Sequence, residues 1–70
     1  MFEAKARSVI RFTITDGMLT FMNDEEMDLI QKEAVRVRRY EREGCWAIYA
    51  NEGSELSDAL YRVQERYHGG

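Results

Sequence analysis

The chain has 70 residues, of which 44% are hydrophobic and 33% are charged, and its formal net charge is −3. This composition indicates one folded domain rather than a disordered chain, and the negative charge argues against nonspecific nucleic-acid binding. A chain of this length buries only about 60% of the surface that its unfolded form exposes. We therefore expect a single domain over residues 1–70, frayed over residues 1–6 and 68–70, and stabilised by self-association as a homodimer.

The first predicted element is a strand over residues 8–15, SVIRFTIT, in which apolar and polar residues alternate. Asp16-Gly17 follows, a dipeptide that suits the tight turn of a hairpin. Residues 18–22, MLTFM, then predict the returning strand. The chain is therefore expected to begin with a β-hairpin.

Residues 23–44 predict one long helix, around which the other elements are arranged. Asn23 is a good N-cap, and Glu26 completes a capping-box pattern three residues later. Acidic residues crowd the first turn and arginines the last turns, as the helix dipole favours. Gly44 suits the left-handed position just after a helix end.

Part of the same stretch supports an alternative interpretation. In Ala34–Glu41, valines alternate with arginines as in a strand, and Arg42-Glu43-Gly44 would then be a hairpin loop into the next strand. The cap, the charge gradient and the helix-forming residues favour the single helix, but the alternative stays open.

Cys45–Ala50, CWAIYA, predicts a third strand, and its lack of polar alternation indicates a central strand covered on both faces. Ser54 is the expected N-cap of a final helix that ends near Gly69-Gly70. The predicted order is β-β-α-β-α, a small α+β domain with a three-stranded antiparallel sheet covered by two helices. The alternative is β-β-α-β-β-α, with Ala34–Glu41 as a strand.

The sequence indicates no catalytic, metal-binding or cofactor-binding site. Cys45 is the one cysteine and His68 the one histidine, so we expect neither a disulfide nor a Cys/His metal set. The acidic residues that begin the predicted central helix lack the ligand spacing and the glycine of a calcium loop. Phosphate-binding and dinucleotide-binding motifs are missing as well. We therefore expect a protein that is not an enzyme and needs no cofactor.

No segment approaches the ~20 apolar residues that a membrane span needs. The first residues lack the apolar core of a signal peptide, and a lone cysteine without a secretion signal suits a reducing compartment. These features predict a cytoplasmic protein with no membrane contact.

Basic and aromatic residues on the predicted helix surfaces are the candidate partner-binding site. On one helix, Lys32, Arg36 and Arg39 would form a solvent-facing stripe with the spacing i, i+4, i+7. Tyr61 lies off the apolar stripe of the last helix, next to Arg62, and we expect it to be exposed. Tyrosine and arginine are the residue types that concentrate binding energy at interfaces.

These features predict a small non-catalytic protein-interaction module that binds a partner protein through its helical surface. By analogy in size and charge alone, it resembles accessory or inhibitory proteins of phages and mobile elements. The alternative function is a nucleic-acid-binding or regulatory module that uses the basic patch Arg36–Arg42 against phosphates.

Overall fold

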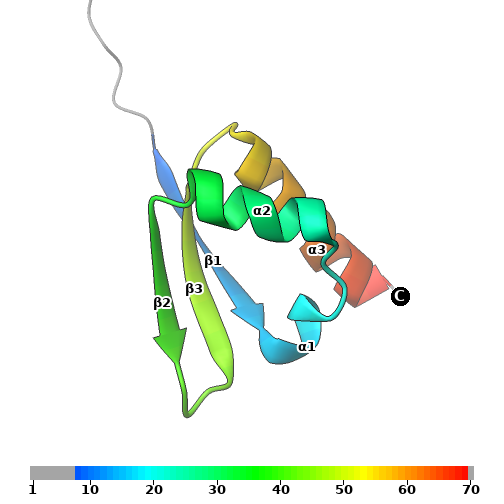
Figure 1. Cartoon of the computed structure of the whole chain (residues 1–70). Coiled ribbons are helices and arrows are strands. Elements are labelled where there is room, and N and C mark those ends of the chain that lie inside the picture. The colour runs from blue at the N-terminus through cyan, green and yellow to red at the C-terminus, as the bar shows by residue number, and fades with distance from the viewer. Residues whose placement is uncertain (1–7, 70) are drawn as a thin grey trace, which may run out of the picture.

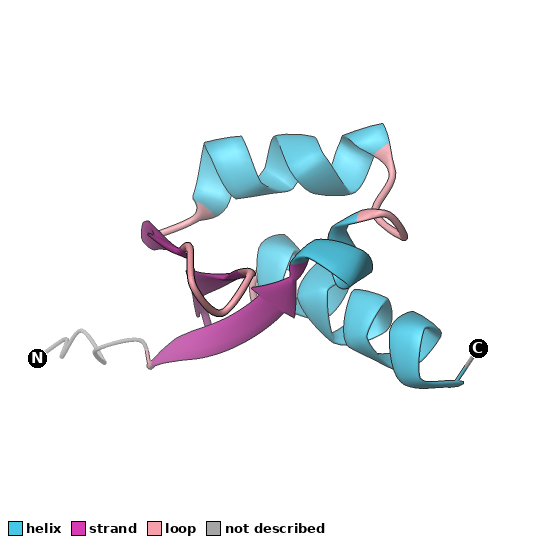
Figure 2. Cartoon of the chain, turned by 90° about the horizontal axis from the view of Figure 1, so that it is seen from below, coloured by secondary structure: helices cyan, strands magenta, loops and turns pink. Residues whose placement is uncertain are grey.

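The computed structural model describes residues 8–69, which form three strands and three helices (Figure 1). In chain order these are β1 (Val9–Thr15), α1 (Asp16–Leu19), α2 (Asp24–Glu33), β2 (Arg36–Tyr40), β3 (Cys45–Asn51) and α3 (Glu55–Gly69). The strands form one antiparallel sheet in the order β1-β3-β2, and the two longer helices lie on the same side of it (Figure 2). The predicted fold class, α+β with a three-stranded antiparallel sheet and covering helices, is confirmed.

The predicted first hairpin is wrong, because the chain enters a helix after β1 instead of a second strand. The hydroxyl oxygen of Thr15 accepts a hydrogen bond from the N–H of Met18 at 3.2 Å and so caps α1, while the Met18 side chain is buried in the core. A type I′ turn needs positive φ at both Asp16 and Gly17, and neither residue has it. Residues 18–22 therefore form no strand.

The predicted central helix is correct only at its start. Asn23 caps α2 as expected: its Oδ1 accepts the N–H of Glu26 at 2.8 Å, and Glu26 Oε1 accepts the N–H of Asn23 at 3.0 Å. The helix ends at Glu33, since Ala34 adopts an extended conformation with ψ of 128°. The alternative interpretation of Ala34–Glu41 as a strand is confirmed, because β2 lies within this range.

Pairing with β3 explains why the chain leaves the helix. β3 is the central strand, as predicted, and β2 is its second neighbour. The expectation that β3 is covered on both faces is wrong, because among the described elements the two longer helices lie on the same side of the sheet (Figure 2). Ile48 pairs with Phe12 of β1 on one side and with Val37 of β2 on the other, so the three residues form an apolar row on one face of the sheet. Gly44 has the predicted left-handed conformation, with φ of 65°, but in the β2–β3 loop, where its N–H donates to the carbonyl of Glu41 at 3.2 Å.

The core lies between the sheet and the helices. Ser54 caps α3 as predicted, because its Oγ accepts the N–H of Ser57 at 3.1 Å. The apolar stripe of α3 then packs on β1 and β3. The buried cluster comprises Phe12, Ile14, Met18, Ile48, Ala50, Leu56, Leu60 and Val63.

Side-chain hydrogen bonds join α2 to α3. Glu26 is only 5% exposed, and its two carboxylate oxygens accept hydrogen bonds from the Arg66 guanidinium at 3.0 and 3.2 Å. Arg66 also donates to the carbonyl of Phe21. The bonds from Arg66 lower the pKa of the Glu26 carboxyl, against the desolvation that would raise it. Farther along α2, Glu33 Oε1 accepts the N–H of Leu56 at 3.1 Å.

The two ends that we expected to be frayed differ in what the structure describes. Residues 1–6 and residue 70 lie outside the described residues. Residues 68 and 69 belong to the last turn of α3. Among residues 8–69, no helix is long and apolar enough to span a bilayer.

Candidate protein-binding surface

The two faces of the sheet differ in composition and in cover. Residues opposite each other on neighbouring strands share a face, so the register assigns every strand residue to one side. One face contributes the sheet residues of the buried core and is covered by the helices. The other, which we call the open face, carries Val9, Arg11, Thr13, Thr15, Arg36, Arg38, Tyr40, Cys45, Ala47, Tyr49 and Asn51.

The open face is basic although the chain is acidic. Arg11, Arg36 and Arg38 are all exposed on it. None of the three strands contains Asp or Glu, whereas the whole chain has 13 of these residues. Within the described part of the chain, the ion pairs involve other arginines. Positive charge without a carboxylate partner is therefore concentrated on one side of the sheet.

Two tyrosines lie among these arginines. The guanidinium carbons of Arg11 and Arg38 lie 5.7 and 5.4 Å from the ring centre of Tyr40, and that of Arg36 lies 6.0 Å from the ring centre of Tyr49. Such cation–π contacts are worth about 0.5–1 kcal/mol each at exposed sites. They hold the guanidinium groups over the rings, where the N–H groups remain available for carboxylate or phosphate oxygens.

The structure separates the basic residues that the sequence analysis grouped in one stripe. Lys32 is exposed in the last turn of α2 and Arg36 lies on the open face. Arg39 lies on the opposite, helix-covered face, because it is an odd number of residues from Arg36 on the same strand. The predicted helical stripe is wrong, since the helix that it requires ends at Glu33.

Arg39 is engaged within the molecule. Its guanidinium donates to both carboxylate oxygens of Asp16, at 2.7 and 3.1 Å, and lies 5.1 Å from the ring centre of Trp46. These hydrogen bonds lower the pKa of the Asp16 carboxyl and raise that of the Arg39 guanidinium. The N–H of Asp16 also donates to the carbonyl of Gly44 at 3.0 Å. The Arg39–Asp16 ion pair and this backbone hydrogen bond therefore connect the β2–β3 hairpin to α1.

Tyr61 and Arg62 lie on α3. Tyr61 is 49% exposed, as predicted. The rings of Tyr61 and Phe12 pack edge to face, and their centroids are 4.9 Å apart. Tyr61 is thus partly committed to packing on the helix-covered face of the sheet.

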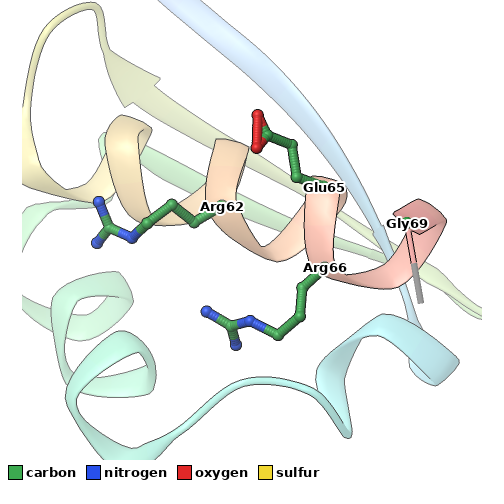
Figure 3. Close-up of a pocket in the computed structure, with 4 residues that line it drawn as sticks. All are labelled: Arg62, Glu65, Arg66 and Gly69. Carbon is green, nitrogen blue, oxygen red and sulfur yellow. The ribbon is translucent and has the colours of Figure 1, made fainter.

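Arg62 lines a shallow hollow on the surface of α3 together with Glu65, Arg66 and Gly69. Figure 3 shows the side chains of Arg62 and Arg66 extending the same way, whereas that of Glu65 points elsewhere. Arg66 already binds Glu26 there. The hollow therefore offers a partner less available positive charge than the open face does.

An apolar groove lies between α2 and the sheet, with a volume of about 140 Å³. Met27 from α2 and Val37 from β2 line it, and each is 42% exposed. We call this hollow the α2–β2 groove. Its lining consists of Leu19, Met27, Ile30, Val37, Trp46 and Ile48.

Arg11, Tyr40 and Tyr49 were not predicted from the sequence to be members of one surface. For Arg11 and Tyr40, the strand alternation in the sequence was a usable signal. Arg11 lies on the polar side of the first predicted strand, and the strand interpretation of Ala34–Glu41 places Tyr40 on the same side as two arginines. What the sequence did not specify is that both strands pair with β3 and bring these sides together.

Among residues 8–69, no three or more His, Cys, Asp and Glu side chains are arranged to hold a metal ion. Comparisons of the chain with protein-family models, with curated proteins and with solved structures give no match. Function is therefore inferred from the geometry and charge of these surfaces.

Proposed function

We propose that this chain is a small non-catalytic interaction module that binds an acidic segment of a partner protein on its open face. The observation that carries the proposal is a sheet face with three exposed arginines and two tyrosines but no carboxylate. Arginine binds carboxylates through paired hydrogen bonds, and Tyr and Arg contribute strongly at interfaces. The proposal keeps the function predicted from the sequence and moves the binding surface from the helices to the sheet.

The distribution of negative charge supports a protein partner over a nucleic acid. The net charge of the chain is −3. Glu41 and Glu43 lie in the β2–β3 loop and Glu52 follows β3, so carboxylates border the sheet at both ends of β3. A long phosphate backbone would pass these carboxylates and be repelled. A short acidic protein segment fits between them.

A second candidate function is the binding of single-stranded nucleic acid on the same face. Aromatic rings interspersed with arginines on an antiparallel sheet suit base stacking and phosphate contacts. Tyr40 and Tyr49 are half-buried, however, and arginines of the chain already lie over both rings. Bases would have to displace these arginines, which ranks this candidate second.

The remaining expectations from the sequence belong to the same proposal. The size and charge of the chain support an accessory or inhibitory protein of phage or mobile-element type that acts in the cytoplasm. A homodimer is also proposed, because a domain of 70 residues buries a limited core.

Titration with an oligoglutamate peptide of about eight residues tests the proposal, and two matched double variants locate the binding surface. R36Q/R38Q removes two charges from the open face, whereas K32Q/R62Q removes two charges from the helices. At about 50 mM salt, we expect the first variant to weaken binding roughly tenfold. The second should change it less than about twofold.

Two outcomes of this titration would contradict the proposal. An equal loss in both variants would indicate unspecific charge attraction instead of a defined surface. Tighter binding of a short oligothymidine than of the oligoglutamate peptide, lost in R36Q/R38Q, would favour the nucleic-acid candidate.

A further inference from the structure

We propose that the free edge of β2 accepts an extended strand of a partner protein in which apolar and acidic residues alternate. The apolar side chains of that strand enter the α2–β2 groove, and the acidic ones face the arginines of the open face. This inference rests on the proposed function and specifies the partner segment that the open face binds.

Within residues 8–69, β2 has one side without a neighbouring strand. The strand order β1-β3-β2 places it at an edge of the sheet, where Figure 1 also shows it. Its first three residues, Arg36–Arg38, are exposed. Every second residue of an edge strand directs its backbone N–H and C=O away from the sheet. These groups supply the main-chain hydrogen bonds by which a partner strand is added.

One side of this edge is apolar. Val37 on β2 and Met27 on α2 line the α2–β2 groove together with Trp46, and both aliphatic side chains are exposed. Val35, directly before β2, is 53% exposed. An apolar cavity of roughly 150 Å³ holds a benzene-sized group, so the groove of about 140 Å³ has room for an apolar side chain.

The other side of the edge is cationic. Arg36 and Arg38 extend from β2 on the open face and are exposed. Successive residues of an added strand point to alternate sides. A strand that places an apolar residue in the groove therefore places its neighbours beside the two arginines, where carboxylates are favoured.

The same arginines disfavour a second copy of this chain as the occupant. Antiparallel pairing of two β2 strands centred on Val37 would place Arg36 of one copy opposite Arg38 of the other, and centring on Arg38 would oppose that residue to itself. Like charges directly opposite each other destabilise a sheet. The charge of the edge thus selects an acidic strand from another protein.

A synthetic peptide of about eight alternating valine and glutamate residues, blocked at both ends, is the probe. Trp46 is the one tryptophan of the chain and lines the groove, so its fluorescence reports occupancy. We expect a saturable change with this peptide and none with the matched valine–lysine peptide. Two further valine–glutamate peptides carry backbone N-methyl groups, one at every valine and the other at every glutamate. Only one of these two sets of N–H groups faces β2. The peptide methylated at that set should lose binding, because its methyl groups block edge pairing, and the other peptide should retain it.

Variants of the groove test the apolar contacts. Val37→Thr and Met27→Gln remove apolar character from the two walls while keeping side-chain size and the preference for strand or helix. Each should weaken binding of the valine–glutamate peptide roughly fivefold. Phe21→Gln makes a comparable change at an exposed apolar side chain that lies outside both the groove and the open face, and it should leave binding within about twofold.

A peptide with the same composition, but with valines and glutamates in separate blocks, distinguishes this inference from the proposed function. If it binds as tightly as the alternating peptide, and only R36Q/R38Q weakens both, strand addition is wrong while acidic binding on the open face stands. If neither peptide binds the intact protein, both the inference and the proposed function are overturned.

Discussion

The two faces of the sheet are built from the same three strands, yet one is an apolar core and the other a basic surface. Alternate residues of a strand point to opposite faces. In β1, Phe12 and Ile14 are therefore buried under the helices. Arg11, whose side chain lies on the opposite side of the strand, is exposed on the open face. Stability and binding are thus assigned to opposite faces, and substitutions should be able to change one without the other.

The largest effect on stability is expected in the core under the covered face. Leu60 on α3 is fully buried, and Leu60→Ala should lower the free energy of unfolding by about 2–5 kcal/mol. Urea denaturation followed by circular dichroism measures this loss. Glu65→Ala on the exposed side of the same helix is the control, with an expected change within about 0.5 kcal/mol. Equal losses in the two variants would contradict the described packing of α3.

A smaller and pH-dependent effect is expected at Glu26, which joins two covering helices. Glu26→Gln keeps the shape of the side chain but weakens its bonds to Arg66, so we expect a loss of about 1–2 kcal/mol at neutral pH. The pKa of Glu26 is lower in the folded than in the unfolded protein. The contribution of its charge is therefore fully present above the unfolded pKa and disappears as the pH falls through the folded pKa.

Urea denaturation of the parent protein and of Glu26→Gln across this acidic range checks that prediction. The difference between the two should shrink as the pH is lowered. Asp16→Asn serves for comparison, because it makes the same change at an exposed ion pair, that of Asp16 with Arg39. The pKa of Asp16 is also lowered. A difference for Glu26→Gln that stays constant with pH would show that the charge of Glu26 contributes nothing.

The smallest effect on stability is expected on the open face. Arg38→Gln removes an exposed charge that has no carboxylate partner among the described residues and loses only its contact with the Tyr40 ring, so the free energy of unfolding should change by less than about 1 kcal/mol. Binding of the oligoglutamate peptide by this variant should nevertheless depend less steeply on salt. A large loss of stability in Arg38→Gln would break the division between the two faces, because it would make the open face part of what holds the fold together.

Some elements could be predicted because their signals are local. Asn23 with Glu26 marks the start of α2, Ser54 marks the start of α3, and the alternation in residues 8–15 marks β1. Residues 18–22 and the second half of the predicted helix failed for a common reason. Their local preferences suit more than one structure, and burial of Met18 in one case and pairing of β2 with β3 in the other decided between them.

The sequence by itself determined an α+β domain, the caps of its two longer helices and the central third strand. Only the tertiary structure decided where the arginines lie. On a helix, Arg36 and Arg39 share a face because three residues complete almost one turn. On a strand, an odd separation places them on opposite sides. Pairing with β3 therefore leaves Arg36 on the open face and turns Arg39 toward Asp16 and Trp46.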